Sequence, residues 1–444
     1  MDMTYEERIA GLFERHRSVQ SDGFSASAYK PGLERMEELD TLSGHPHRRF
    51  RSVHVAGTNG KGGVCCMLAA ALASCGFRTG LYTSPHLTDF RERIKCSLPG
   101  GGAFGMIPKE AVLAFMDRFE LPGLSFFELT TGLAFKWFAD SQLDFAVLET
   151  GLGGRLDSTN IVTPAISIIT SIGLDHCDLL GSTRAAIARE KAGIFKRGVP
   201  ALVWGRDPET QPVFESVAPA VGCPLYYAED YELPPLLADA ESSRAKPEYM
   251  NLRTVWAALS LLTEGGSAFA LSSEVQDAIL NAYAITGFRA RWERLELSVD
   301  ALPACTQKPE IICDIGHNPP ALKLCFDRLK ASGKRLYIVF GIMADKDLEG
   351  ILPLMPGEAQ WFAVAPSTPR ALPAEALAER LSEAGLSVRC CASVKEGIAA
   401  ALGAITLGTA FESPHTDAPA LLYIGGSTYT VSDALGSGFF EAVE

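Results

Sequence analysis

The chain has 444 residues, of which 47% are hydrophobic and 21% charged, and its formal net charge is -13. The composition indicates a globular protein rather than a disordered chain, and the length fits two or three domains, with two as the simpler expectation. The negative charge argues against nucleic acids and anionic lipid surfaces as partners, and no stretch is long and apolar enough to cross a bilayer.

The N-terminal residues mix acidic and basic side chains and lack the apolar core of a secretory signal. The eleven cysteines contain no Cys-x-x-Cys pair and no regular spacing, so neither a zinc cage nor a disulfide framework is expected. We therefore expect a cytoplasmic protein whose partners are small molecules.

The first expected strand, residues 50–56, runs into the segment GTNGKGG, and a helix of small residues follows as far as Phe77. Further strands are expected at 80–83, 145–149, 165–170 and 201–204, with helical patterns between several of them. This alternation predicts an α/β domain, residues 1–287, with a P-loop-type, doubly wound and mostly parallel sheet.

A second set of α/β elements begins after residue 290. Strands are expected at 311–316 and in segments that end at Gly341 and Ser367, with a helix over 321–330. The set predicts a smaller Rossmann-like α/β domain, residues 288–444. A glycine within ITGFRARWE marks the expected hinge.

The segment GTNGKGG has features of a phosphate-binding loop, because a glycine loop that opens a helix presents N–H groups to anions and Lys61 adds a positive charge. The standard G-x-x-x-x-G-K-[ST] pattern is not met, since Gly57 lies only four residues before Lys61 and Gly62 follows it. Neither Gly62 nor Gly63 supplies the hydroxyl that binds magnesium in standard loops. A glycine-rich turn without a ligand is the alternative.

Three polar residues follow expected strands at their carboxyl ends, where ligands gather in doubly wound sheets: Ser84, Glu149 and His176. Glu149 closes the run DFAVLE and is placed to reach the magnesium of a nucleotide, with a solvated carboxylate as the alternative. A lone histidine such as His176 is more often structural than a metal ligand.

Lys191 lies in AREKAGIFK, on an expected helix that Ser182 or Thr183 could cap. Its spacing alone indicates a solvated cation beside Glu190. No chemistry follows from this position without further information.

Seven motifs occur in order across residues 54–196: HVAGTNGKG, LYTSPHL, ERI, FFELTTGLAF, VLETGLGGRLDSTN, TSIGLDH and AREKAGIFK. DIGHNP at 314–319 and FGIMADKD at 340–347 extend the series over nearly the whole chain. The ordered set resembles the folylpolyglutamate synthase and dihydrofolate synthase family, within the Mur ligase superfamily. The resemblance implies a P-loop domain and a smaller C-terminal domain that act on ATP and an acceptor acid.

This resemblance implies roles for residues of the first domain. The nucleotide is expected on the phosphate loop, at Gly57, Thr58, Asn59, Gly60, Lys61 and Gly62, with Lys61 as the clamp on the phosphates. Two magnesium ions are implied, one of them held by Ser84, Glu149 and His176. The other is implied at Lys191, as a lysine that becomes a carbamate and so changes from a cation into an anion.

The segment that contains Pro85 and His86 and the loop around Phe127 resemble regions that receive or cover the pteridine of a folate. Phe127 is therefore a stacking candidate, with a place in the apolar core as the alternative. In the second domain, Arg291 resembles an arginine that approaches the phosphates.

Asp314 resembles a nucleotide contact and His317 a residue near the reacting centre. The chain also departs from the family pattern, which usually has Ser or Thr in place of Gly63 and DGAHN in place of DIGHN. Arg253 stands where the family has an asparagine that faces the nucleotide. These departures put the phosphate and adenine contacts in doubt.

The implied reaction is ATP-dependent addition of L-glutamate to a folate or to dihydropteroate. The acceptor carboxylate attacks the γ-phosphate, and the amine of glutamate then attacks the acyl phosphate. Lys61, Arg291 and magnesium are expected to neutralise the transferred charge. The family is commonly monomeric.

Two other functions stay open. The first is a Mur-family ligase with a different acceptor, such as a UDP-sugar peptide, although only 56 residues precede Gly57 and leave little room for a UDP-binding domain. The second is a non-catalytic nucleotide-binding descendant, which the departures at Gly63 and Arg253 would allow.

Overall fold

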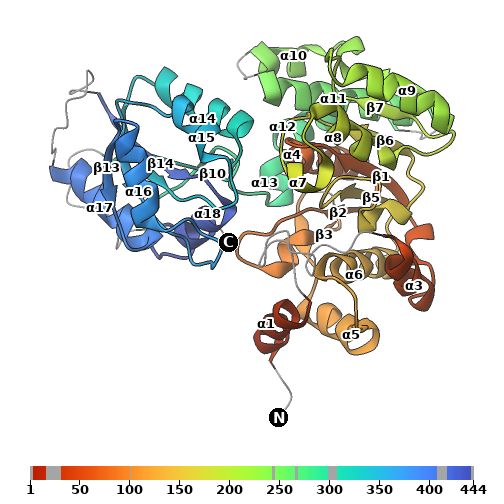
Figure 1. Cartoon of the computed structure of the whole chain (residues 1–444). Coiled ribbons are helices and arrows are strands. Elements are labelled where there is room, and N and C mark those ends of the chain that lie inside the picture. The colour runs from red at the N-terminus through yellow and green to blue at the C-terminus, as the bar shows by residue number, and fades with distance from the viewer. Residues whose placement is uncertain are drawn as a thin grey trace. The chain divides into compact units, whose positions relative to one another are not determined.

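The computed structural model describes residues 4–16, 32–100, 102–242, 246–265, 269–298, 308–407 and 418–441. The chain divides into two compact units, Met1–Phe288 and Arg289–Glu444. Each unit contains a mostly parallel sheet with helices packed on it (Figure 1). The α/β fold class expected from the sequence is confirmed.

The first unit contains an eight-stranded sheet in the order β4-β3-β2-β5-β1-β6-β7-β8. The strands are β1 (Arg51–Ala56), β2 (Thr79–Tyr82), β3 (Ile94–Ser97), β4 (Phe104–Met106), β5 (Phe145–Glu149), β6 (Ile166–Ile169), β7 (Ala201–Val203) and β8 (Leu225–Tyr227). Neighbouring strands are parallel except at the β2–β3 and β3–β4 pairs. The carboxyl ends of β1, β5 and β6 therefore lie at one edge of the sheet.

Helices cover both faces of this sheet because successive strand residues point to opposite sides. Val147 of β5 packs in a cluster with α4 (Lys61–Ser74), α11 (Lys246–Glu264), α12 (Ser273–Leu280) and α13 (Ala282–Thr286). Its neighbours Ala146 and Leu148 pack in another cluster, with α3 (Glu34–Leu42), α5 (Lys109–Phe119) and α6 (Phe126–Asp140). The two helical layers leave uncovered the loops at the carboxyl ends of the strands, and functional groups can lie there.

The remaining helices of this unit are α1 (Tyr5–Arg15), α7 (Cys177–Leu180), α8 (Arg184–Lys191), α9 (Gln211–Val221) and α10 (Pro235–Ser242). Short 3₁₀ helices occur at Pro46–Arg48, Phe90–Arg93, Ser158–Ile161, Ala192–Ile194 and Ala228–Asp230. Among the described residues of the whole chain, no helix has the length and apolar character needed to span a bilayer.

The second unit has a six-stranded sheet in the order β13-β12-β11-β14-β10-β9. The strands are β9 (Glu293–Arg294), β10 (Glu310–Asp314), β11 (Arg335–Phe340), β12 (Gln360–Ala363), β13 (Ser387–Cys390) and β14 (Ala420–Gly425). β9 is antiparallel to β10, and the other pairs are parallel. The last strand of the chain, β14, thus lies between β10 and β11.

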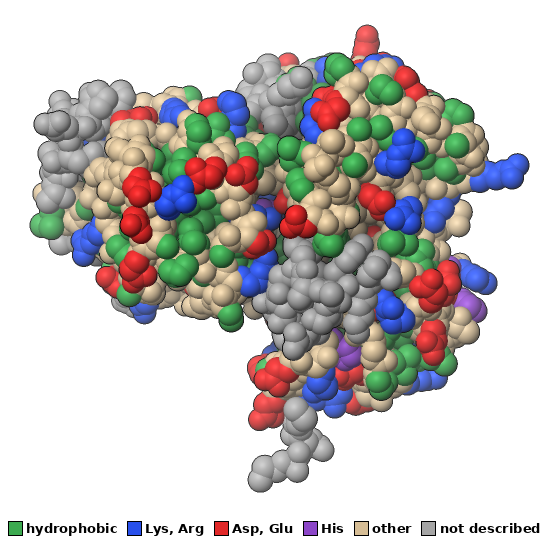
Figure 2. Space-filling model, viewed as in Figure 1, with side chains coloured by type: hydrophobic (Ala, Val, Ile, Leu, Met, Phe, Trp, Pro, Cys, Tyr) green, Lys and Arg blue, Asp and Glu red, His purple; other side chains and the backbone are tan. Residues whose placement is uncertain are grey.

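The helices of the second unit are α14 (Pro319–Ala331), α15 (Leu348–Ile351), α16 (Ala374–Glu383), α17 (Val394–Leu407) and α18 (Thr428–Leu435), with a 3₁₀ turn at Leu352–Leu354. Its core is centred on Phe326, Phe340 and Trp361, whose rings pack 5.7 to 6.3 Å apart. On the molecular face drawn in Figure 2, acidic and basic side chains of the described residues are interspersed. Among the described side chains drawn there, lysines and arginines form no broad basic area.

Candidate active site

The segment between β1 and α4 has the backbone of a phosphate loop. Gly57 and Gly60 have φ angles of 154° and 90°, which glycine adopts far more readily than other residues. A Cβ at Gly57 would lie 1.8 Å from Oγ1 of Thr170, so no side chain fits there. α4 begins at Lys61, earlier than the sequence suggested, and no side chain caps its first turn. Such an uncapped turn attracts anions.

The strand end after β6 holds this loop in place. The backbone N–H of Thr58 donates to the carbonyl of Ser171 at 2.7 Å, and the hydroxyl of Thr58 donates to the carbonyl of Gly173 at 3.1 Å. The backbone N–H of Asn59 donates to Oγ of Ser171 at 3.3 Å. The loop is therefore fixed before any ligand binds.

Lys61, Ser84 and Glu149 come together at this edge of the sheet. Nζ of Lys61 donates to the carbonyls of Gly57 and Thr58 at 3.1 and 3.3 Å, and it lies 4.0 Å from Oε1 of Glu149. Oε2 of Glu149 accepts from the backbone N–H of Ser84 at 3.0 Å. Glu149 is only 4% exposed, so the solvated carboxylate considered above is wrong.

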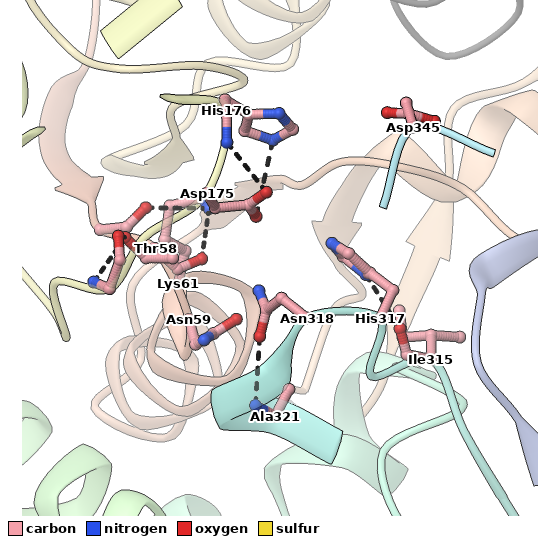
Figure 3. Close-up of polar contacts among 12 residues, drawn as sticks. Thr58, Asn59, Lys61, Asp175, His176, Ile315, His317, Asn318, Ala321 and Asp345 are labelled. Atoms are coloured by element: carbon pink, nitrogen blue, oxygen red, sulfur yellow. Dashed lines mark hydrogen bonds and ion pairs between the residues drawn. The ribbon is translucent and has the colours of Figure 1, made fainter. Parts of the chain in front are cut away.

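His176 occupies the position before α7, with a left-handed φ of 54°. Its ring Nε2 lies 3.6 Å from Oδ2 of Asp175, and its backbone N–H donates to Oδ1 of the same carboxylate (Figure 3). Within the described ranges, no group of three or more His, Cys, Asp or Glu side chains is arranged to hold a metal ion. The part of His176 in a metal site therefore stays a prediction.

Lys191 ends α8, and the hydroxyl of Thr183 caps the start of that helix. Its Nζ donates to the carbonyl of Gly57 at 2.7 Å, and the residue is 4% exposed. Burial, helped by the positive charge of Lys61, lowers the pKa of Lys191 to about 7. Asp175 opposes this shift. The solvated cation that spacing alone indicated is wrong.

The two folate candidates after β2 differ in environment. Pro85 is exposed, whereas His86 is half-buried and its Nδ1 accepts a hydrogen bond from Nε of Arg93 at 2.8 Å. Burial and the charge of Arg93 lower the pKa of His86 to about 3. His86 is therefore neutral at physiological pH.

Phe127, the third folate candidate, is half-buried at the start of α6. A Cβ at Gly151 would lie 2.5 Å from Cζ of Phe127, and the Phe127 ring lies 5.8 Å from that of Tyr82. The ring thus borders the loop that follows β5, and it is not enclosed in the core.

In the second unit, the buried carboxylate of Asp314 holds two backbone segments. Oδ2 accepts from the N–H of Trp292 at 2.8 Å, and Oδ1 accepts from the N–H of Gly316 at 2.7 Å. The N–H of Ile315 donates to the carbonyl of Ala290 at 3.2 Å. Asp314 therefore joins the entry to this unit with the DIGHN loop.

Arg291 lies between Ala290 and Trp292, which have φ angles of 61° and 49°. Left-handed backbone at two such residues is unfavourable, and here it presents an exposed arginine. Nδ1 of His317 lies 3.1 Å from the carbonyl oxygen of Ile315. Both Arg291 and His317 are thus placed by the segments that Asp314 holds.

Sequence reasoning missed Asp157 and His54, which lie behind the loop after β5. Asp157 accepts from the N–H groups of Leu152 and Thr159 at 2.8 and 3.0 Å, and burial raises its pKa. Nε2 of His54 lies 2.7 Å from the hydroxyl of Thr159. A carboxylate directly after a glycine-rich stretch, as in GLGGRLDSTN, was the signal that could have identified this support.

A cavity of about 120 Å³ lies beside the phosphate loop, at the carboxyl ends of β6 and β7. Its wall includes Thr170, Ser171, Trp204 and Met250. Since the hydroxyls of Thr170 and Ser171 donate to the carbonyl of Asn59, the cavity and the loop share a wall.

The chain matches two families of domains, the Mur ligase middle domain over residues 123–226 and the Mur ligase glutamate ligase domain over residues 294–409. It is 32% identical over 406 residues to a dihydrofolate synthase/folylpolyglutamate synthase of Haemophilus influenzae, covering 85% of this chain and 89% of that protein. It is also 32% identical over 377 residues to a folylpolyglutamate synthase of Lacticaseibacillus casei, covering 81% and 86%.

The structure is similar to E. coli FolC in complex with DHPP and ADP, with a TM-score of 0.74, 29% identity, and coverage of 98% of this chain and 97% of that one. It is likewise similar to a bifunctional folylpolyglutamate synthase/dihydrofolate synthase with Mn, AMPPNP and L-glutamate bound, with a TM-score of 0.75, 27% identity and 98% coverage of both chains. With its motifs, both sheets and these relatives in agreement, the chain belongs to the dihydrofolate synthase/folylpolyglutamate synthase family of Mur ligases.

Proposed function

We propose that the chain is an ATP-dependent ligase that joins L-glutamate to a folate, to dihydropteroate or to both, with release of ADP and phosphate. The observation that carries this proposal is the meeting of three ionisable groups at one glycine loop. Lys61 and Lys191 both donate to the carbonyl of Gly57, and Glu149 lies 4.0 Å from Lys61. Such a set suits a triphosphate with a divalent cation.

The proposed reaction has two steps. A carboxylate oxygen of the acceptor attacks the γ-phosphorus of ATP, and ADP leaves with the electrons of the broken P–O bond. The amine of glutamate then attacks the acyl carbon, phosphate leaves, and the amine loses a proton as the amide forms. Lys61 stabilises charge on the transferred phosphoryl group through a position that the loop fixes beforehand. No protein nucleophile is needed.

The residues at the strand ends fit a divalent cation. The carboxylate of Glu149 is buried beside a lysine, and a buried carboxylate needs positive charge or hydrogen bonds close by. We assign Ser84, Glu149 and His176 as the residues that would hold magnesium. When bound there, magnesium would neutralise charge on the β- and γ-phosphates.

Lys191 is the proposed site of a carbamate that would hold a second ion. A carbamate forms when a neutral amine attacks carbon dioxide and loses one proton. The burial that lowers the pKa of Lys191 to about 7 makes the neutral amine available at physiological pH. Its Nζ also lies at the phosphate loop, where an anion could meet a metal ion.

The remaining assignments rest on family membership. Pro85, His86 and Phe127 are proposed to receive the pteridine, and Arg291, Asp314 and His317 to act at the nucleotide and the reacting centre. We further propose that residues 1–287 form the ATP-binding domain and residues 288–444 the ligase domain of a cytoplasmic monomer, without nucleic-acid or membrane partners.

The proposed function is tested by measuring ADP release with ATP, magnesium and L-glutamate, with dihydropteroate or tetrahydrofolate as the acceptor. Activity with both acceptors would identify a bifunctional synthase, and activity with one would assign the acceptor. Turnover only with a UDP-sugar peptide would replace the proposal. ATP binding without turnover of any acceptor would favour the non-catalytic descendant.

A further inference from the structure

The first turn of α4 contains two adjacent glycines, Gly62 and Gly63, whose backbone does not require glycine. Neither has a positive φ angle, and both are buried. Glycine also destabilises a helix relative to residues with a side chain. The lack of side chains at these two positions therefore has a cause outside the helix backbone.

That cause is a pair of aromatic side chains that fill the neighbouring space. A Cβ at Gly62 would lie 2.8 Å from Cζ of Phe288, and a Cβ at Gly63 would lie 2.8 Å from the hydroxyl oxygen of Tyr283. Real Cβ atoms essentially never approach other atoms so closely. The hydroxyl of Tyr283 thus lies where a side chain of residue 63 would lie.

Several contacts fix Tyr283 at this place. Its ring packs 5.5 Å from that of Phe288, whose N–H donates to the carbonyl of Tyr283 at 2.9 Å. Nζ of the buried Lys95 donates to the carbonyls of Thr286 and Gly287, both at 2.8 Å, at the end of α13. The short helix that carries Tyr283 is therefore anchored to β3.

A second polar side chain reaches the same turn from α11. A Cβ at Gly60 would lie 2.7 Å from Oδ1 of Asn251, and a Cβ at Gly63 would lie 3.7 Å from Nδ2 of Asn251. Arg253, two residues further along, instead donates to the carbonyl of Tyr231 at 3.3 Å. An amide from another position of this helix thus faces the loop.

We infer that the hydroxyl of Tyr283, which fills the place of a side chain at residue 63, donates a hydrogen bond to the nucleotide phosphates at the first turn of α4, beside the amide of Asn251. Both groups can donate hydrogen bonds, which phosphate oxygens accept. The inference rests on the proposed function only in that the loop binds a nucleotide. On this inference, the Tyr283 hydroxyl compensates for the side chain that Gly63 lacks, so Gly63 does not indicate a lost nucleotide site.

The test is a double-mutant cycle on Tyr283 and Gly63, read out as AMPPNP binding by calorimetry with magnesium and without an acceptor. Tyr283→Phe is expected to raise Kd about three- to tenfold, the usual effect of losing one hydrogen bond. Gly63→Ser is expected to weaken binding as well, because the serine meets the Tyr283 hydroxyl. The double variant should bind within about twofold of wild type, since the serine then supplies the hydroxyl and the collision is gone.

Tyr226→Phe is the matched control, because Tyr226 is also partly buried against the same core cluster. It should leave Kd unchanged, and Tyr226→Phe and Tyr283→Phe should both unfold within about 2 °C of wild type without nucleotide. Wild-type binding by Tyr283→Phe, or a double variant no better than either single one, would overturn the inference. Because binding needs no acceptor, a wild type that is inactive with folates but shows this cycle would refute the proposed function alone.

Discussion

Lys191 places its buried Nζ 2.7 Å from the carbonyl oxygen of Gly57, a residue 134 positions earlier in the chain. The contact joins the end of α8 to the first residue of the phosphate loop. An ammonium donates there readily, but burial favours the neutral amine. Lys191 can therefore donate a hydrogen bond to the loop as an ammonium, or react at its nitrogen as a neutral amine.

We predict that Lys191 carries a carbamate in the active enzyme. Removal of carbon dioxide should lower turnover and bicarbonate should restore it. Because the neutral amine reacts, activity without added bicarbonate should fall as the pH drops through about 7, the pKa of Lys191. Lys191→Ala should be rescued in part by formate or acetate, whereas Lys61→Ala should not. An unmodified lysine, by intact mass, in a fully active sample would rule the carbamate out.

We predict that Lys61→Ala reduces turnover at least about 100-fold, because it removes a fixed positive charge from the transferred phosphoryl group. The variant also loses hydrogen bonds to Gly57 and Thr58, so a stability loss of about 1 kcal/mol is expected by denaturant unfolding. Lys196→Ala is the control, since Lys196 donates to the carbonyl of Asn160 at 2.9 Å. Equal effects of both variants on turnover would remove Lys61 from the mechanism.

We predict that Phe127→Leu raises KM for the folate acceptor about fivefold and leaves KM for ATP unchanged. Leucine keeps an apolar side chain but cannot stack on a pteridine, and stacking contributes about 1 kcal/mol. The neighbouring Phe126, only 2% exposed, provides the control. Phe126→Leu should lower the melting temperature without a selective effect on KM. If Phe127→Leu behaves in the same way, Phe127 belongs to the core.

We predict that His54 destabilises the fold in acid. Burial lowers its pKa to about 3, and among the described residues its Nδ1 has no hydrogen-bond partner. Below pH 6.5 the unfolded chain takes up a proton that the folded chain does not, so stability is lost as pH falls from 6.5 toward 3. The loss at pH 5 is on the order of 2 kcal/mol, since one pKa unit corresponds to about 1.4 kcal/mol.

Replacement of His54 by Gln tests how much of the stability lost in acid comes from His54, because Gln does not titrate and can still donate to Thr159. Denaturant unfolding at pH 7 and pH 5 should show a smaller loss for His54→Gln than for wild type. Identical losses would show that other groups, such as paired carboxylates, account for the acid sensitivity.

Strands were the most predictable part of the fold. β1, β5 and β6 are buried on both faces and read as continuous apolar runs, so their positions follow from the sequence. The β3–β4 hairpin was not expected, because both strands are short and only partly buried. The strand β14 was also missed, although it is an equally continuous buried apolar run; its place between β10 and β11 could not follow from the sequence, because both neighbours come much earlier in the chain.

Within the site, the approach of Ser84 to Glu149 follows from the rule that parallel strand ends meet at one edge. The contact of Lys191 with Gly57 could not follow from spacing, because it depends on how α8 packs. The helical state of Gly62 and Gly63 was missed for a related reason. Their propensity indicates a loop, and the aromatic rings that explain them lie more than 200 residues further on.

The bonds of Asp314 have a mechanical consequence for the second unit. One side chain fastens the segment before β9 to the turn after β10, so Arg291 and His317 cannot shift independently. Asp314→Asn would keep the shape but turn one acceptor oxygen into a donor that faces a backbone N–H. Arg291 and His317 would then no longer be held in place by the same side chain, so the single substitution Asp314→Asn would disturb both residues.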